Sequence, residues 1–189
     1  MKKFYLKFWG VRGSIPVPGE STKKYGGNTS CIEICCDGKI IIFDAGTGIY
    51  NLSKEQKIDD VDVFLTHTHL DHIQGFPFFK PLYNPKAKVR VWAGNLKPER
   101  NLSDTIEQII KPPIFPLNLK DLKAQVEFKD FIAGKIINLD DITIKTFLLN
   151  HPDSATAYRL EYKNKSICYV TDVEHKKDSV DMKLSEFIK

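Results

Sequence analysis

VDVFLTHTHLDHIQGFPFF, residues 61–79, is the stretch of this sequence that decides its fold. Its apolar run, 61–65, predicts a strand, and the chemistry-bearing residues follow directly: His67, His69, Asp71 and His72. Because side chains alternate along a strand, the first two histidines leave its end on one face, whereas the aspartate and the third histidine fall where a helix could begin. Imidazole and carboxylate are ligands that zinc favours. The spacing therefore predicts a site for two divalent metal ions a few ångströms apart.

The other histidines of this chain lie in similar settings. The sequence has 5 histidines in all; His151 follows an apolar run in LNHP, and His175 lies three residues after Asp172. A single histidine is usually an ordinary polar residue, so none of them would support the prediction alone. Their concentration favours metal binding over chance clustering.

Five further motifs point to a known family. They are FWGVRGSIPVPG (8–19), YGGNTSC (25–31), IIFDAGTG (41–48), LNHP (149–152) and YVTDVEH (169–175). With Thr-His-x-His-x-Asp-His, they resemble the metallo-β-lactamase superfamily, in its phosphodiesterase and ribonuclease Z-like branch, and in particular bacterial cyclic-nucleotide phosphodiesterases. The resemblance covers residues 4–175. It implies an α/β fold, the αββα sandwich of two mixed β-sheets flanked by helices, formed by a single domain over residues 1–189.

The resemblance also implies a ligand set. The first metal would be held by His67, His69 and His151, and the second by Asp71 and His72, with Asp172 bridging the two. Asp44, at the end of a strand before a glycine turn, would lie behind these ligands and orient them; by itself, the position is equally typical of a helix cap. Zinc is the expected metal, with manganese as an alternative.

The same comparison implies a mechanism. A hydroxide held between the metals would attack phosphorus, because two cations lower the pKa of bound water and absorb charge on the phosphoryl oxygens. Asp71 would accept a proton from that water, and His175 would donate one to the leaving oxygen. A helix opening after His72 would add partial positive charge facing an anionic substrate.

One departure from the family pattern affects the second metal. The superfamily closes that site with a further downstream histidine, and no histidine follows His175 here. We therefore expect a C-terminally truncated form of the fold with an exposed sheet edge, an intact first metal site and a weakened second one. His175 is the alternative ligand. Three explanations of the absent histidine compete: a truncated or split gene product completed by another chain, a compact variant, and a degenerate protein.

The loop over residues 10–30 is the candidate substrate-binding segment. It is rich in glycine, proline and small polar residues, and a phosphate could be bound by Arg12, Ser14, Asn28 and Thr29. Plain turn chemistry explains each of these residues equally well. Phe115, in a proline-rich segment, would stack on a base or simply pack.

Composition limits the other possibilities. Apolar residues make up 42% of the chain and the net charge is +4, so neither disorder nor, from charge alone, nucleic-acid binding is indicated. Four cysteines without a Cys-x-x-Cys pair indicate reduced thiols. The N-terminal segment lacks a signal-like apolar core, and no run is long enough to span a membrane. We expect a cytoplasmic protein that does not bind membranes.

Alternating patterns and turn residues predict the remaining elements. Strands are expected at 4–9, 31–36, 39–43, 89–92, 126–132, 137–138, 142–149, 158–162 and 166–170. Asp37-Gly38 and 163–165 predict hairpins. Helices are expected up to about Gln56 and from Ser103 to the Pro112-Pro113 pair.

These observations favour a metal-dependent phosphodiesterase acting on a small cyclic nucleotide or cyclic phosphate. A ribonuclease Z-like endonuclease acting on RNA 3′ ends is the alternative, although no long basic arm for transfer RNA is visible. A non-catalytic or impaired binding subunit is a third hypothesis, raised by the absent histidine. β-Lactamase and thioesterase activities are disfavoured by the flanking motifs. Relatives of this kind are often homodimers, so a second copy is a further expected partner.

Overall fold

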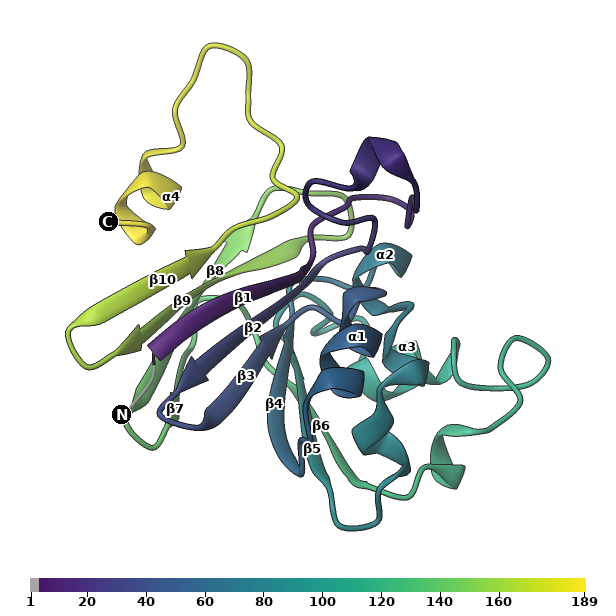
Figure 1. Ribbon diagram of the computed structural model, residues 1–189. Helices are drawn as coiled ribbons and strands as arrows, with labels where there is room; N and C mark the ends of the chain where they lie inside the picture. Colours follow the sequence, from purple (N-terminus) through teal and green to yellow (C-terminus); the bar gives the residue numbers. More distant parts are fainter. Residues whose placement is uncertain (1–3) are drawn as a thin grey trace.

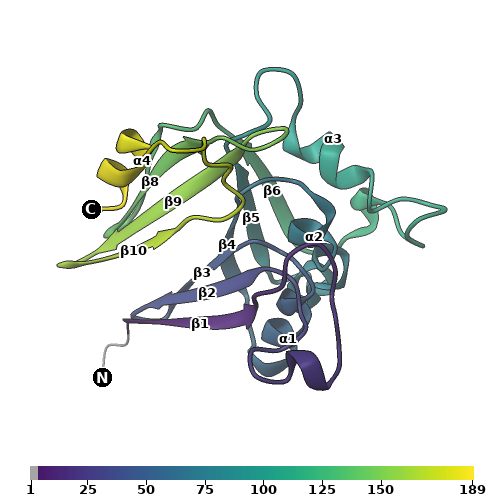
Figure 2. The same ribbon diagram turned by 90° about the horizontal axis from the view of Figure 1, so that it is seen from above.

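The computed structural model describes residues 4–189, so the first three residues of the N-terminal segment that we examined for a signal lie outside the described part. Two β-sheets face each other, with helices on their outer faces (Figures 1 and 2). This is the αββα architecture that the family resemblance implies. A sheet with an apolar face must bury that face against another layer, and residues of both sheets share one apolar cluster.

The first sheet has six strands in sequential order. They are β1 (Phe4–Gly10), β2 (Cys31–Cys36), β3 (Lys39–Phe43), β4 (Asp60–Leu65), β5 (Lys88–Ala93) and β6 (Gln125–Asp130). β1 to β3 pair antiparallel, and β3 to β6 pair parallel. The β2–β3 hairpin turns at Asp37 and Gly38, which both have positive φ, at 51° and 101°. The predicted hairpin is therefore present.

The second sheet has four strands, in the order β10-β9-β8-β7. They are β7 (Ile136–Leu139), β8 (Ile142–Leu149), β9 (Ala155–Tyr162) and β10 (Lys165–Tyr169). All of its pairs are antiparallel, so only the first of the two sheets is mixed. Short turns join its successive strands, and such turns can connect only antiparallel neighbours. Within residues 4–189, β10 pairs with β9 alone and forms one edge of the sheet.

Short helices cover the outer faces. The structure contains α1 (Gly48–Glu55), α2 (Leu70–Ile73), α3 (Leu102–Glu107) and α4 (Met182–Phe187), with 3₁₀ turns at Glu20–Thr22, Phe76–Phe78, Lys80–Tyr83 and Leu119–Asp121. α4 lies against the second sheet, where Phe187 meets Phe147. Among the described residues, no helix is sufficiently long and apolar to span a bilayer.

Two helix predictions need correction. α3 begins at Leu102, one residue before the expected start at Ser103, because Asn101 is its cap: Asn101 Oδ1 accepts a hydrogen bond of 2.9 Å from the Asp104 N–H. It ends at Glu107, well before the Pro112-Pro113 pair that was expected to stop it. The helix expected to open after His72 instead begins at Leu70 and lasts four residues. So short a helix ends at Ile73, and it supplies no dipole directed past His72 toward a substrate.

The core between the sheets determines how their strand ends meet. Phe43 of β3 stacks on Tyr158 of β9 with ring centroids 5.2 Å apart, and Phe64 of β4 contacts the same tyrosine edge-on. The Tyr158 hydroxyl, fully buried, donates to the Leu65 carbonyl at 2.5 Å. Burying such an aromatic side chain contributes about 1.5–3 kcal/mol. These contacts fix the C-terminal end of β4 against the second sheet.

Candidate metal centre

The predicted ligands come from three strand ends that meet at one edge of the sandwich. β4 ends at Leu65 and leads into His67 and His69, β8 ends at Leu149 before His151, and β10 ends at Tyr169 before Asp172. The backbone between β4 and His67 is joined to the second sheet, because the Thr156 N–H of β9 donates to the Thr66 carbonyl at 2.7 Å. Side chains more than 80 positions apart in sequence are thereby brought together.

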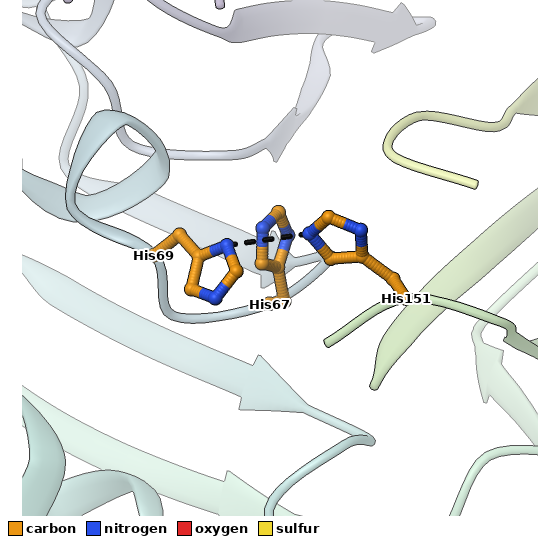
Figure 3. A group of neighbouring side chains, drawn as sticks. All are labelled: His67, His69 and His151. Atoms are coloured by element: carbon orange, nitrogen blue, oxygen red, sulfur yellow. Dashed lines mark hydrogen bonds between the residues drawn. The ribbon is translucent and has the colours of Figure 1, made fainter. Parts of the chain in front are cut away.

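The first ligand group consists of His67, His69 and His151, each offering a ring nitrogen within 4.8 Å of the others (Figure 3). Nε2 of His151 lies 3.3 Å from Nδ1 of His69. Zinc–nitrogen bonds of about 2.0–2.1 Å at a tetrahedral angle place two ligand nitrogens about 3.3–3.4 Å apart. The donor set and this spacing fit a divalent metal such as zinc.

The second ligand group consists of His67, His72 and Asp172, whose ligand atoms also lie within 4.8 Å of one another. Nε2 of His72 is 2.9 Å from Oδ2 of Asp172. Asp172 takes a left-handed backbone conformation, φ 40°, and the Thr171 hydroxyl donates to its Oδ2 at 2.8 Å. His67 belongs to both groups, so the two sets lie next to each other. The bridging role of Asp172 stays a prediction.

Asp44 lies behind both groups and is completely buried. Its carboxylate accepts hydrogen bonds from the Thr66 N–H at 2.7 Å, the Tyr169 hydroxyl at 2.9 Å and Nδ1 of His72 at 2.9 Å. The Thr66 hydroxyl lies 3.0 Å from both Asp44 oxygens and 3.1 Å from Nδ1 of His67. With the protons assigned from this network, the Nδ1–H of His72 points to Asp44 and that of His67 points to the Thr66 hydroxyl, so both histidines present Nε2 to a metal.

The two buried histidines differ in their protonation. Burial, with the charge of neighbouring His72, lowers the pKa of His67 to about 4, so this ring is neutral at pH 7. Burial also opposes charge on His72, but the carboxylates of Asp44 and Asp172 outweigh it and raise its pKa to about 10. The hydrogen bond from His72 holds the pKa of Asp172 well below its usual range. His72 and Asp172 therefore form an ion pair in the metal-free protein.

Asp71 lies beside the second group without completing it. Its Oδ2 accepts a 2.7 Å hydrogen bond from the Ser14 N–H and lies 3.5 Å from Nε2 of His72. The only predicted phosphate-binding residue with a direct link to the ligands is thus Ser14, through its backbone. Its φ of 68° turns that N–H toward Asp71.

The remaining candidate residues occupy other positions. His175 belongs to neither ligand group; it is exposed and lines a cavity of about 340 Å³ beside α4. Thr29 is fully buried and exchanges hydrogen bonds with Thr47, and the Thr47 hydroxyl also donates to the side chain of Asn28. Both residues therefore brace the loop in this structure. Arg12 is exposed beside a small cavity of the same loop.

Phe115 packs against the helix-side core, with its ring edge-on to Phe78 at 5.6 Å. Packing was one of its two predicted roles, and the structure places it there.

Sequence reasoning missed three residues that hold the site together. Thr66 and Tyr169 contact Asp44, and Asp153 lies 3.8 Å from Nε2 of His69. Thr66 is part of the Thr-His-x-His motif, so its position was a usable signal. A tyrosine ending one strand and an aspartate in a turn carry no such signal, because their partners are distant in sequence.

Comparison with known proteins agrees with this geometry. The sequence profile described as "Beta-lactamase superfamily domain" matches residues 39–187, more than half of the chain. The chain belongs to this superfamily. Its fold is that of the metal-dependent hydrolases of the superfamily, as the sequence motifs predict, and the two ligand groups are candidate sites for their divalent metals.

Solved structures share the fold at low sequence identity. The metallo-β-lactamase-fold protein YhfI from Bacillus subtilis is 16% identical, with a TM-score of 0.66 over 91% of this chain and 63% of its own. A diphosphatase of the PhnP family is 20% identical, with a TM-score of 0.63 over 82% and 61%. The short form of human tRNase Z is 19% identical, with a TM-score of 0.64 over 88% and 68%.

A curated relative matches a shorter segment. Hydroxyacylglutathione hydrolase from Wigglesworthia glossinidia brevipalpis is 38% identical over 61 residues, 29% of this chain and 24% of the relative. The chain thus spans less than two thirds of the length of this relative and of the first two solved structures.

Proposed function

We propose that this chain is a metal-dependent phosphodiesterase whose substrate is a small cyclic nucleotide or a similar cyclic phosphate. The observation that carries the proposal is the sharing of His67 by two ligand groups. Two groups with a common residue lie close enough for two metals to act on one phosphodiester. When bound there, the metals would lower the pKa of a water ligand and neutralise charge on the phosphoryl oxygens.

The protein's own side chains supply the remaining functions. The first metal would be held by His67, His69 and His151, and the second by Asp71 and His72, with Asp172 bridging the two. The Asp71 carboxylate, whose Oδ2 accepts the Ser14 N–H and lies 3.5 Å from Nε2 of His72, would take a proton from the attacking water. Arg12, exposed in the loop that also carries Ser14, would attract the anionic diester.

The likeness to proteins named for phosphoester chemistry, a diphosphatase and a tRNase Z, supports this reaction class. The tRNase Z likeness also keeps RNA 3′-end cleavage as the second candidate. The short match to a hydroxyacylglutathione hydrolase makes thioester hydrolysis a third reaction to test. We further propose that residues 1–189 act as one domain in the cytoplasm. The domain would work as a homodimer or with a second chain that completes it, and a weakened second metal site would depend on that partner.

A substrate panel tests the proposal. Purified protein, loaded with zinc or manganese, is given cyclic mononucleotides, bis-p-nitrophenyl phosphate, a precursor transfer RNA and a hydroxyacylglutathione thioester. Turnover of the small diesters alone is expected. Cleavage of the RNA or the thioester alone would replace the substrate assignment, and no turnover of any substrate would favour a binding subunit.

A matched pair of variants ties any activity to the site. Asp71→Asn keeps an acceptor for the Ser14 N–H but cannot take a proton, so the rate should fall by about 10²–10⁴-fold. Asp140→Asn changes an exposed aspartate in the turn before β8, at the other end of that strand from His151, and should leave the rate unchanged. Equal rates in the two variants would exclude Asp71 from the reaction.

A further inference from the structure

We propose that Asp153 is a positioning residue for His69: its carboxylate holds the imidazole so that Nδ1 faces the first metal. The inference rests on the metal site in the proposed function and adds a residue to it. Nε2 of His69, the ring nitrogen that faces away from His151, has a carboxylate beside it.

The orientation of the His69 ring defines the need for such a partner. Its Nδ1 lies 3.3 Å from Nε2 of His151, on the inner side of the first group, so Nε2 is directed outward. The Asp44 network fixes His67 and His72 through their Nδ1 atoms and does not reach His69. The His69 side chain is 41% exposed, so packing alone constrains it weakly.

Asp153 is the carboxylate placed at that outward nitrogen. Its Oδ2 lies 3.8 Å from Nε2 of His69, within ion-pair distance, and its Oδ1 lies 3.6 Å from Nη1 of Arg100. A metal at Nδ1 withdraws electrons from the ring and strengthens the attraction between Nε2–H and a carboxylate. Asp153, His69 and a metal at Nδ1 would thus form a carboxylate–histidine–metal arrangement.

The backbone around Asp153 is shaped to put the carboxylate there. Asp153 and Ser154 both have left-handed φ values, 57° and 64°, and the Ser154 N–H donates to the His151 carbonyl at 2.8 Å. Nδ2 of Asn95 donates to the carbonyls of both turn residues, at 3.4 and 3.3 Å. One braced turn therefore supplies His151 to the metal and a carboxylate to the neighbouring ligand.

The competing explanation for the position of Asp153 is a surface ion pair with Arg100 that has no effect on the metal. Asp153→Asn separates the two, since asparagine also tolerates positive φ and keeps the turn. Asp140→Asn is the matched control, because Asp140 has a φ of 58°, is exposed and pairs with Lys39. Unfolding of both metal-free variants, followed by circular dichroism, should match that of the wild type.

The test measures metal binding directly. Zinc affinity is determined by competition with a chromophoric chelator, and one equivalent of Co²⁺ reports the ligand geometry through its visible absorption. Asp153→Asn should weaken the tightest zinc site about 10-fold, the lower end of the usual range for such partners because this carboxylate is exposed, and should shift the cobalt spectrum. Asp140→Asn should change neither.

The outcomes separate this inference from the proposed function. Unchanged zinc affinity and cobalt spectrum in Asp153→Asn would overturn the positioning role while leaving the metal site in place. A wild-type protein that binds no zinc would overturn both. Tight zinc binding that Asp153→Asn weakens supports the inference even if no phosphodiester is turned over.

Discussion

The two ligand groups share His67, yet the protein prepares them differently. In the first group, two histidine nitrogens stand 3.3 Å apart without a carboxylate between them. In the second, Nε2 of His72 already makes a 2.9 Å ion pair with Asp172. In the second group a metal must replace the proton on Nε2 of His72, whereas the ligand nitrogens of the first group have no such ion pair between them. Adjacent sites in one fold can thus differ in metal affinity through the surroundings of a single imidazole.

The comparison is sharpened most by removing two of the three carboxylates near His72, those of Asp44 and Asp172. Asp44 is fully buried and accepts hydrogen bonds from four donor groups. Asp44→Ala should lower the free energy of unfolding of the metal-free protein by about 3–5 kcal/mol, because charged His72 loses its buried partner. The Asp172 side chain is 35% exposed, so solvent screens its ion pair with His72. Asp172→Asn should therefore lower the free energy of unfolding by less than about 1 kcal/mol.

Urea unfolding in the presence of a chelator measures both variants. Equal losses would contradict the distinction between an interior carboxylate that organises the site and a partly exposed one that is free to bind metal. Zinc content, measured on the same preparations, should show a reduced second equivalent in Asp172→Asn.

A second way to test the comparison is to vary pH. The pKa of His72 is raised to about 10, so between pH 6 and 9 its ring is protonated, and a metal entering the second group must release that proton. Affinity at this group should therefore rise with pH, by up to about tenfold per unit. The pKa of His67 is lowered to about 4, so this ring needs no deprotonation over the same range.

Calorimetric titration in buffers of different ionisation enthalpy counts the protons released. The weaker binding event should release about one proton from His72 at pH 7. Release of that proton with the tighter event would mean that the second group fills first, reversing the order that the structure predicts.

The fold was largely predictable because its signals are local. β8 has the predicted bounds, since apolar and polar residues alternate along it, and the Asp37-Gly38 turn is a strong hairpin signal. β9 begins at Ala155, three residues before the predicted strand, because Ala155, Thr156 and Ala157 are fully buried although small residues give little strand signal.

The site was predictable in its parts and not in its connections. The motifs and the family resemblance predicted the candidate ligands, but they could not show that His67 is common to both groups, because that depends on how β4 meets β8 and β10. It also could not show that Thr29 is buried while Arg12 is exposed, since both lie in one polar loop. Such distinctions arise from tertiary packing, which period and composition do not encode.

The smallest expected effect concerns His175, which the sequence offered as an alternative ligand for the second metal. In the structure it lines a cavity with residues of the α4 region, and neither ligand group includes it. His175→Asn should leave zinc stoichiometry and both affinities unchanged, in contrast to His72→Asn, which should remove the second equivalent. Metal content after dialysis, measured by mass spectrometry, decides between them. Loss of a zinc equivalent in His175→Asn would require the segment after Asp172 to fold back over the site when metal binds, and the second ligand group would then have to be redefined with that segment as a part of it.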